Sequence, residues 1–482
     1  MAATKQLPAA AVFLLLYLAI RVRSASSALH EIHRGFSVTH DSSYTEFQPL
    51  LADPTGVFSL GFLRVDSSQL DLAVLHLPST TALWRAQASR SVLWSASVSL
   101  SFNGGLVLSD SATGMLWSTA TDAGERVVLL NTSNLQVVGS DAVLWQSFDF
   151  PSDTLVQDQN FTSTAALFSR DQRFSMRLGP SYLALFMELG GGAAPVMYWK
   201  HSALEAKGQI VPDEGPIYAR VEADGFLGMY QKATLVDVYS FDSFNRRIAG
   251  LRRLTLESDG NLRAHYWNGS IWIQDIQAIA DSERCEIPTT CGAYGLCKPD
   301  DTRCGCLDDS VQEGCLPASS GDFCGSGGSE FGVLRRKGVD LTSKDLMASQ
   351  KVASLEECES ACERNCSCWG AIYNNASGFC YQLDYPIQTL VEADDRKEGY
   401  FKVRTEGGSG GGEAVKRARV ALLTVGSLVL SGTMAFGAYR VWSRRRMQAS
   451  VDEEGLAPGP YKTLNSASFR SIELSNSLSD RK

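Results

Sequence analysis

The hydrophobic positions between residues 30 and 160 follow the short alternation that is typical of β-strands. Apolar runs of a few residues are broken by Gly, Asp, Asn and Ser, and no long stretch has the 3.6-residue period of a helix. The pattern returns between residues 165 and 280, where we expect strands at 174–178, 182–189 and 196–199. The first 280 residues are therefore predicted to be all β.

A four-residue unit recurs three times in the first of these regions. Its copies are Val92-Leu93-Trp94-Ser95, Met115-Leu116-Trp117-Ser118 and Val143-Leu144-Trp145-Gln146. A repeat this short supplies only a few strands, and their apolar face must be buried against the other copies. We therefore expect a threefold all-β unit in which the three tryptophans converge.

Two longer apolar runs lie near the ends of the chain. The run Ala9–Ile20 follows Lys5 and precedes small residues, which is the order of a secretory signal peptide spanning residues 1–27. The stretch Val420–Tyr439 has no charged residue and is long enough to cross the roughly 30 Å hydrocarbon core as one helix. The cleaved signal, with Arg440 and the arginines at 444–446, predicts a single-pass type I protein of the plasma membrane with its N-terminus outside.

The formal net charge of -9 is unevenly distributed. The segments before residue 28 and after residue 412 are net basic, so the acidic excess lies in the intervening region. Like charge opposes the approach of nucleic acids and other polyanions, and no nucleic-acid partner is expected.

All 12 cysteines lie between Cys285 and Cys380. Behind a signal peptide, such crowding predicts small modules held together by disulfides. The first six have spacings similar to those of a compact EGF-like module: Cys285, Cys291, Cys297, Cys304, Cys306 and Cys315.

The second six cysteines surround a predicted helix; they are Cys324, Cys358, Cys362, Cys366, Cys368 and Cys380. Ser354-Leu355-Glu356-Glu357 is a capping box, which opens a helix that places Cys358 and Cys362 one turn apart on one face. Such a helix stapled to a small sheet resembles the PAN or apple domain. Zinc ligation by the closely spaced cysteines is the alternative, and a secreted location disfavours it.

The run from Leu144 to Leu155, Leu-Trp-Gln-Ser-Phe-Asp-Phe-Pro-Ser-Asp-Thr-Leu, resembles the signature that closes the bulb-type lectin domain of plant S-locus glycoproteins and G-type lectin receptor kinases. The run Leu254–Leu262, followed by Tyr266-Trp267, resembles the second β-prism of the S-locus ectodomain. The resemblance implies a mainly β ectodomain with two tandem β-prisms of three small sheets, an EGF-like module and an α+β PAN domain. The expected parts are a signal peptide (1–27), a bulb-type lectin-like domain (28–160), a second lectin-like domain (161–280), the EGF-like module (281–318), the PAN domain (319–405), a Gly-rich linker (406–419), the transmembrane helix (420–439) and a cytoplasmic tail (440–482).

The same resemblance implies a disulfide pairing, one of many that the cysteines permit. The implied pairs are Cys285–Cys297, Cys291–Cys304, Cys306–Cys315, Cys358–Cys380, Cys362–Cys368 and Cys324–Cys366.

The mannose pocket of the family follows the pattern Gln-x-Asp-x-Asn-x-Val-x-Tyr, and this chain departs from it. The nearest stretch keeps only the valine: Ser101, Asn103, Gly105, Val107 and Ser109. A second stretch keeps only the asparagine: Leu130, Thr132, Asn134, Gln136 and Val138.

In the second prism, Glu257, Asp259 and Asn261 retain the polar end of the pattern, but Arg263 and His265 replace its valine and tyrosine. The alternative for these residues is a strand that leads into an Asp-Gly turn. Because a sugar pocket needs several convergent hydrogen-bonding groups, we expect classical mannose binding to be lost and the fold to serve as a scaffold or protein-binding surface.

Five glycosylation sequons suit an extracellular surface: Asn131, Asn160, Asn268, Asn365 and Asn375. Asn365 is the disfavoured one, because Cys366 lies inside its sequon and an early disulfide would block modification.

The sequence predicts neither an enzyme nor a cofactor or metal site. Residues 440–482 contain no Gly-rich loop, no Asp-x-x-x-x-Asn and no Asp-Phe-Gly of a kinase, and His30-Glu31-x-His33 is one residue short of the zincin motif. The serine-rich tail is either a phosphorylation and docking segment or a disordered stub.

Two functions of different classes remain. The first is a receptor-like protein without kinase activity, which binds an extracellular peptide, glycoprotein or glycan and acts through partner receptor kinases. The second is a non-signalling interaction or decoy protein, which forms homo- or heterodimers through its PAN and lectin domains and sequesters ligand or receptor.

Overall fold

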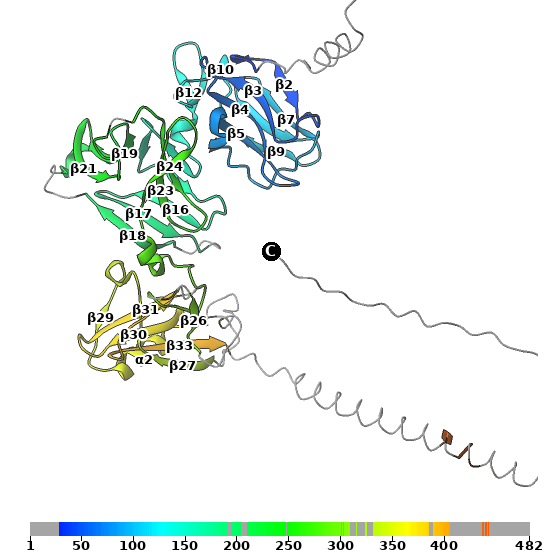
Figure 1. Cartoon of the computed structure of the whole chain (residues 1–482). Helices are drawn as coiled ribbons and strands as arrows, with labels where there is room; N and C mark the ends of the chain where they lie inside the picture. The colour runs from blue at the N-terminus through cyan, green and yellow to red at the C-terminus, as the bar shows by residue number, and fades with distance from the viewer. Residues whose placement is uncertain are drawn as a thin grey trace, which may run out of the picture. The chain divides into compact units, whose positions relative to one another are not determined.

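The computed structural model describes residues 28–404, except for 190–193, 204–209, 247, 300, 302, 309–314, 316–322, 325–330 and 385–388, together with residues 436, 437, 439, 440 and 442. The chain divides into two units, Met1–Thr405 and Glu406–Lys482, and the fold described below lies in the first. It is mainly β, as the sequence predicts (Figure 1).

Twelve strands form a first prism, coloured blue to cyan in Figure 1: β1 (Glu31–His33), β2 (Phe36–Thr39), β3 (Phe47–Ala52), β4 (Phe58–Arg64), β5 (Leu70–His76), β6 (Thr81–Arg85), β7 (Val98–Phe102), β8 (Leu106–Asp110), β9 (Gly114–Ser118), β10 (Arg126–Leu129), β11 (Leu135–Val138) and β12 (Val143–Gln146). A short 3-10 turn, η1 (Leu77–Ser79), lies between β5 and β6, and a second, η2 (Ser147–Asp149), follows β12. The strands make three four-stranded sheets in the orders β3-β4-β5-β6, β2-β7-β8-β9 and β1-β10-β11-β12. The inward residues of all three sheets share one hydrophobic core.

Three tryptophans converge in this prism, but they are not the three that the repeat predicts. The rings of Trp84, Trp117 and Trp145 meet edge to face, with centroids 5.7 to 5.8 Å apart, and each lies on the last strand of its sheet. Trp94 lies outside the strands and packs instead on the ring of His40, with centroids 4.0 Å apart. The threefold arrangement is confirmed, and the place assigned to Trp94 is wrong.

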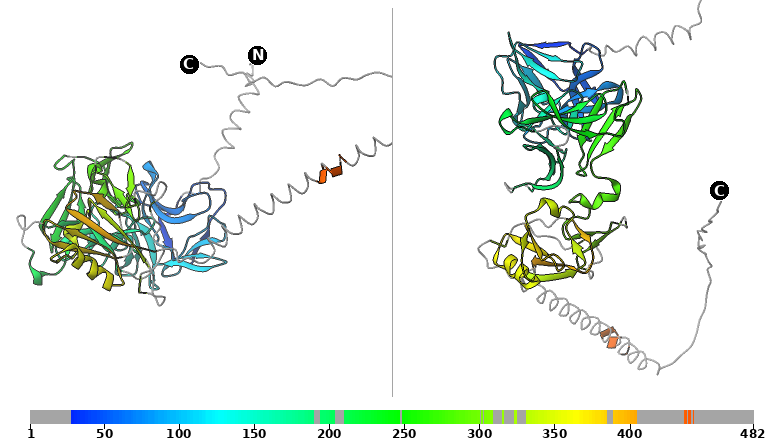
Figure 2. Two further views of the ribbon diagram at one scale, coloured as in Figure 1. Left: turned by 90° about the horizontal axis from the view of Figure 1, so that it is seen from below. Right: turned by 90° about the vertical axis from the view of Figure 1, so that its left-hand side faces the viewer.

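A second prism, coloured cyan-green to green in Figure 2, follows the first along the chain. It repeats the same topology with twelve more strands. They are β13 (Thr154–Val156), β14 (Asn160–Thr162), β15 (Ala166–Phe168), β16 (Phe174–Leu178), β17 (Tyr182–Met187), β18 (Val196–Ser202), β19 (Ile217–Glu222), β20 (Phe226–Gln231), β21 (Thr234–Ser240), β22 (Arg252–Leu256), β23 (Leu262–Trp267) and β24 (Trp272–Gln277), with a 3-10 turn η3 (Pro212–Glu214). In both prisms each of the first three strands joins a different sheet, and the first strand pairs with the sheet that comes last in the chain. In the first prism, β1, β2 and β3 pair with β10, β7 and β4. In the second, β13, β14 and β15 pair with β22, β19 and β16.

The join between the prisms lies earlier than the expected boundary after residue 160. Strand β13 already pairs with β22 of the second prism. Successive residues of a strand point to opposite faces, and here Leu155 is buried in the second core while Val156 is buried in the first. One short strand therefore ties the two cores together.

The prisms also touch along β24. The indole N–H of Trp272 donates to the hydroxyls of Ser79 and Thr81, at 2.9 and 3.0 Å, and the ring of His76 meets Trp267 edge on at 5.1 Å. These polar and aromatic contacts join the η1 region of the first prism to the second prism.

The cysteine-rich region forms one folded body rather than two separate modules. A 3-10 segment η4 (Asp281–Glu286) leads to the hairpin of β25 (Gly295–Cys297) and β26 (Cys304–Cys306). Strand β25 pairs in parallel with β32 (Leu390–Glu392), which in turn pairs with β28 (Val339–Asp340). Tyr294 and Leu296 share a core with Trp369 and Phe401, so the EGF-like and PAN parts bury each other's apolar surface.

The PAN part is a five-stranded sheet in the order β27-β33-β30-β31-β29, coloured yellow to orange in Figure 1. Its elements are β27 (Phe331–Lys337), η5 (Lys344–Leu346), β29 (Gln350–Lys351), α2 (Leu355–Arg364), β30 (Cys368–Asn374), β31 (Phe379–Asp384) and β33 (Lys397–Arg404). Helix α2 begins where the capping box predicts, because the Ser354 hydroxyl accepts the N–H of Glu357 at 3.4 Å.

Six disulfides crosslink this body, and they are the pairs that the family resemblance implies: Cys285–Cys297, Cys291–Cys304, Cys306–Cys315, Cys324–Cys366, Cys358–Cys380 and Cys362–Cys368. Because all 12 cysteines are paired, none offers a thiolate to zinc, and the alternative of a zinc site is wrong.

The predicted signal peptide, the Gly-rich linker, the tail after residue 442 and most of the predicted span 420–439 lie outside the described residues. Within the part of the chain that is described, no helix is both long and apolar enough to cross a membrane.

Candidate functional site

The mannose-pattern positions of the first prism lie along the β7–β8 hairpin. Ser101, Val107 and Ser109 are half-buried strand positions, and Asn103 is exposed in the turn between them. The structure therefore places these side chains on one hairpin, but only short hydroxyls and one amide remain to bind a ligand.

At Gly104 and Gly105 the turn of this hairpin lies close to the backbone of Thr121 and Asp122. A Cβ atom on Gly105 would lie 2.1 Å from the carbonyl oxygen of Thr121, and one on Gly104 would lie 1.9 Å from that of Asp122. A neighbouring backbone does not yield as a side-chain tip does, so neither position can carry a sugar-binding side chain.

The second stretch of the first prism serves the fold as well. Asn134 is buried, its amide donates to the Gln146 side chain at 2.9 Å, and its oxygen accepts from Ser147 Oγ and Phe148 N. Its hydrogen-bonding groups thus anchor the segment that follows β12.

In the second prism the polar end of the pattern forms the predicted Asp-Gly turn. Asn261 is buried, donates to the carbonyl of Ile279 at 2.7 Å and accepts the N–H groups of Ile279 and Leu262. Asp259 pairs with the guanidinium of Arg263 at 2.7 Å. Both side chains are thereby engaged in the fold.

Glu257 and His265 are the remaining positions of the pattern, and burial shifts the pKa of both side chains. Burial raises the pKa of the half-buried Glu257 carboxyl, against the opposing effect of Arg253 and Arg263. For His265, burial and the same two arginines lower the pKa to about 4. Both shifts come from burial, so these two side chains are fitted to the protein interior rather than to a sugar.

A larger opening lies beneath the converging tryptophans, and we call it the tryptophan groove. It has a volume of about 800 Å³, within the roughly 300–1,000 Å³ that is usual for ligand pockets. Its aromatic lining is Trp84, Trp117, Trp145 and Phe150 from the first prism and Phe168 from the second. Its other lining residues are Arg85, Gln87, Ser118, Thr119, Ala120, Asp149, Pro151, Thr164, Ala165 and Ala166.

The groove combines aromatic faces with hydrogen-bond donors. Phe150 is 57% exposed and stacks on Trp145, with ring centroids 5.8 Å apart and planes 8° apart. The indole N–H of Trp84 donates to the carbonyl of Phe150 at 2.8 Å, whereas within the described residues those of Trp117 and Trp145 have no hydrogen-bond partner. Such a surface can pack against an apolar ring face and donate to hydroxyl or carbonyl groups.

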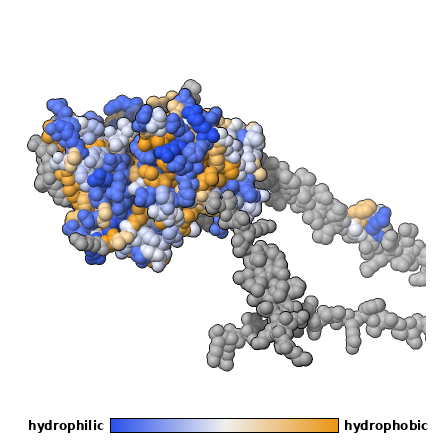
Figure 3. All heavy atoms as spheres, turned by 90° about the horizontal axis from the view of Figure 1, so that it is seen from above, coloured by the Kyte–Doolittle hydropathy of each residue, from blue (hydrophilic) through white to orange (hydrophobic). Residues whose placement is uncertain are grey.

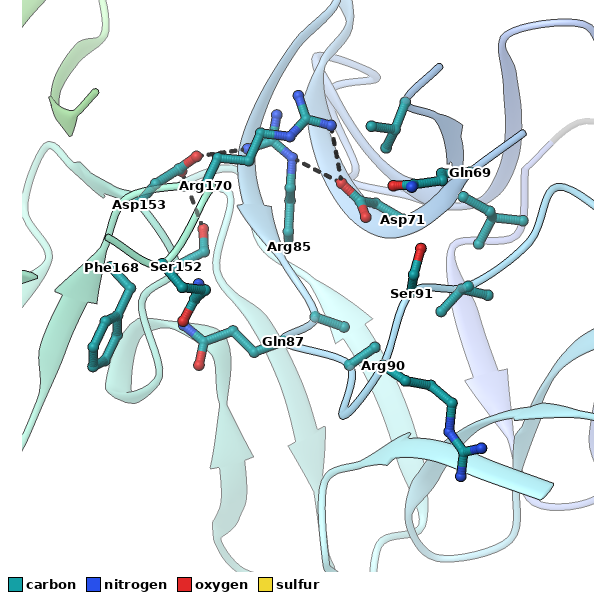
Figure 4. A pocket seen from close by; sticks show the side chains of 16 residues that line it. Gln69, Asp71, Arg85, Gln87, Arg90, Ser91, Ser152, Asp153, Phe168 and Arg170 are labelled. Carbon is teal, nitrogen blue, oxygen red and sulfur yellow. Dashed lines mark hydrogen bonds and ion pairs between the residues drawn. The ribbon is translucent and has the colours of Figure 1, made fainter. Parts of the chain in front are cut away.

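A second cavity adjoins the groove, with which it shares the lining residues Arg85, Gln87 and Phe168. This junction pocket has a volume of about 330 Å³ and is lined by residues of both prisms (Figure 4). An ion-pair chain crosses it: Arg85 lies 2.9 Å from Asp153 and 3.2 Å from Asp71. Arg170 of the second prism extends the chain, 3.7 Å from Asp71.

The sequence patterns did not reveal either opening. Trp117, Trp145 and Phe150 lie in the recognised motifs, but their common groove depends on Trp84, which the repeat missed. The Leu83-Trp84 pair was the available signal, because it matches the Leu-Trp centre of the other units.

We also searched the rest of the described surface for an extended apolar face and for a metal site. On the face shown in Figure 3, hydrophobic patches alternate with hydrophilic ones and do not merge into one apolar face. Among the described residues, no three His, Cys, Asp or Glu side chains are arranged to hold a metal ion.

Three family models match the chain. They are a D-mannose binding lectin model over residues 81–176, an S-locus glycoprotein domain over 225–313 and a PAN domain over 333–402. The lectin match runs from β6 across the join into β16, so it covers part of both prisms and all the residues that line the tryptophan groove.

Among solved structures, similar chains include a lectin of Marasmius oreades (16% identity, TM-score 0.20, 27% of this chain and 92% of that one) and a two-domain fetuin-binding lectin of Scilla campanulata (15% identity, TM-score 0.20, 50% and 99%). The G-type lectin S-receptor-like serine/threonine-protein kinase SD2-5 of Arabidopsis thaliana is 24% identical over 91% of this chain, which spans 55% of that kinase.

A PAN domain-containing protein of Arabidopsis thaliana is 46% identical over 461 residues, which cover 94% of each chain. Together with the two prisms, the disulfide-linked PAN body and the three matching models, this similarity places the chain in a family. The chain belongs to the PAN domain-containing proteins with bulb-type lectin and S-locus glycoprotein domains, which are related to the G-type lectin receptor kinases.

Proposed function

We propose that this protein is a single-pass receptor-like protein of the plasma membrane that binds an extracellular glycan or glycoprotein in the tryptophan groove. In this proposal it has no catalytic activity of its own and acts through partner receptors. The observation that carries the proposal is the groove itself, where Phe150 and two indole N–H groups are available to a ligand.

The contrast with the mannose-pattern positions supports the choice of site. Asn134, Asp259 and Asn261 are engaged in hydrogen bonds or ion pairs of the fold, and Gly105 has no room for a side chain. A ligand that selects this protein must therefore find its contacts elsewhere. The groove supplies both apolar area and donors, the combination that fixes a ligand and its orientation.

The partner is proposed from the related proteins. The G-type lectin S-receptor-like kinases resemble this chain over roughly half of their own length. A partner of that kind would supply the kinase activity, and the extracellular PAN and lectin surfaces would form the complex.

The test is a search for the extracellular ligand with the purified ectodomain. The ectodomain, residues 28–405, is applied to a glycan array and used for affinity capture from the extracellular fluid, each time beside its Phe150→Ala variant. The proposal expects ligands that wild type retains and the variant loses. An ectodomain that captures nothing, or a variant that captures the same ligands equally well, would refute the groove as the binding site.

Deletion of residues 443–482 separates the receptor from the decoy alternative. A receptor that acts through partners on the inner side loses its cellular response without losing ligand binding. If the shortened protein retains the full response, the signalling version of the proposal is wrong.

A further inference from the structure

The six disulfides of the cysteine-rich body differ in their exposure to solvent. All 12 cysteines lie among the described residues, and Cys324–Cys366 is the one pair whose two residues are both exposed. Three pairs are buried at both ends: Cys285–Cys297, Cys358–Cys380 and Cys362–Cys368. In Cys291–Cys304 and Cys306–Cys315 at least one partner is half-buried. A reductant in solution therefore reaches Cys324–Cys366 most easily.

The length of chain that each accessible pair closes also differs. Cys324 and Cys366 are 42 residues apart, against 13 for Cys291–Cys304 and 9 for Cys306–Cys315. The probability that the ends of a flexible loop meet falls with about the −3/2 power of its length, so the thiols of the longest loop meet roughly six to ten times less often. Once reduced, Cys324–Cys366 is therefore the accessible pair that closes again least readily.

The Cys324–Cys366 bond fixes an aromatic ring over the core of the PAN part. Phe323, the neighbour of Cys324, is 8% exposed, and its N–H donates to the carbonyl of Cys366 at 3.2 Å. Its ring lies on that of Trp369, with centroids 4.5 Å apart, and beside that of Phe331, with centroids 5.5 Å apart. Loss of the disulfide removes the covalent bond that keeps Phe323 over Trp369.

The helix and the sheet beneath this ring are joined independently of the disulfide. Trp369 lies fully buried on β30, and Lys402 on β33 is 1% exposed. The Lys402 ammonium donates to the carbonyls of Cys362 and Asn365, at 2.8 and 3.0 Å, at the end of α2. Helix α2 and the sheet thus stay together when Cys324–Cys366 opens, and the change falls on the exposure of Trp369.

We propose that Cys324–Cys366 is a redox-sensitive site, which an extracellular dithiol reduces while the other five disulfides stay closed, and whose opening releases Phe323 from Trp369. One thiolate of the dithiol attacks a sulfur of the pair, so that the S–S bond breaks, a mixed disulfide forms and the other cysteine leaves as a thiolate. The second thiolate of the dithiol then displaces the first cysteine. Two electrons and two protons pass from the dithiol to the two cysteines, and the dithiol becomes a disulfide. The inference does not depend on the tryptophan groove or on its ligand.

Stepwise reduction of the full-length protein in detergent micelles tests the proposal. The protein is equilibrated with graded dithiothreitol, its free thiols are alkylated, and mass spectrometry gives the reduced fraction of each pair. We expect Cys324 and Cys366 to open together, at a dithiothreitol concentration about fivefold or more below that of any other pair. If another pair opens first, or at less than about five times this concentration, the assignment is wrong.

Oxidative footprinting measures what the opening does to Trp369. The double variant Cys324→Ser with Cys366→Ser reproduces the open state without reductant, and Cys291→Ser with Cys304→Ser is the matched control. The first should oxidise Trp369 about threefold faster or more, while the control and the buried Tyr198 of the second prism keep their wild-type rates.

The wild-type protein covers the case in which the double variant does not fold. The same footprinting is then applied to wild type that has been reduced and alkylated at Cys324 and Cys366 alone. Equal protection of Trp369 in the open and closed forms would show that the disulfide does not hold Phe323 over it, and this result would overturn the proposal.

Discussion

Restoring an amide at the mannose pattern should damage the first prism rather than restore mannose binding. The test is Gly105→Asn, which supplies the side chain that the family pattern has at this place. The new Cβ would lie 2.1 Å from the carbonyl oxygen and 3.1 Å from the carbonyl carbon of Thr121. Ordinary contacts of this kind are about 3.4 Å or longer, so the hairpin turn must move by roughly 1 Å.

The expected loss of stability depends on what the new side chain meets, which is the backbone of Thr121. Forcing extra atoms into a packed site costs about 1–3 kcal/mol, and a backbone obstacle belongs at the upper end of that range. For a domain of this size each kcal/mol lowers the unfolding temperature by roughly 3–6 °C. We therefore expect Gly105→Asn to unfold about 6–18 °C below wild type.

The assay is thermal unfolding followed by titration with methyl α-mannoside. The matched control is Ser101→Gln, which restores another residue of the pattern at a half-buried strand position and should change stability by only about 0.5 kcal/mol. Neither variant is expected to bind mannose. A Gly105→Asn protein that unfolds at the wild-type temperature, or that gains mannose binding, would refute the packing argument.

Three further outcomes are expected. Tyr294→Phe removes a buried hydrogen bond to the Lys402 carbonyl, 2.8 Å long, and should cost about 1–2 kcal/mol and speed hydrogen exchange in β33; unchanged exchange there would mean that the EGF-like and PAN parts unfold separately. His265 has a folded pKa of about 4, below its ordinary 6.5, so the unfolded chain gains a proton that the folded one does not, and stability should fall as the pH drops from 6.5 toward 4. His265→Gln should flatten that slope in urea unfolding, and an equal slope in both proteins would contradict the assignment. Asn268→Gln should raise electrophoretic mobility by removing a glycan from an exposed turn, whereas Asn365→Gln should not, because the Asn365 side chain accepts from Ser367 and donates to Gln382.

Local patterns predicted the parts of the fold that local physics determines. The capping box at Ser354 sets the start of α2 because it involves only neighbouring residues. The alternation of apolar residues gave the strands, and three copies of a short unit gave a threefold prism. The disulfide pairs came from the family resemblance and not from spacing, since many pairings fit the same cysteines.

The errors arose where distant segments decide the outcome. Trp94 matches the repeat in sequence, but it lies outside the sheets and packs on His40, whereas Trp84 completes the aromatic triangle. Strand β13 was assigned to the first prism because the lectin signature includes it, yet its hydrogen bonds go to β22, about 100 residues later. The junction pocket was invisible for the same reason, since Asp71 and Arg170 become neighbours only after both prisms have folded.

The central claim is that the tryptophan groove binds the extracellular ligand. It is tested most directly by the ratio of the dissociation constants of Phe150→Ala and wild type for a ligand retained in the capture experiment. Phe150 is 57% exposed, so its removal should leave the fold intact while deleting an aromatic contact of about 1 kcal/mol or more. The predicted result is affinity at least fivefold weaker at an unchanged unfolding temperature; equal affinity for the two proteins would contradict the claim.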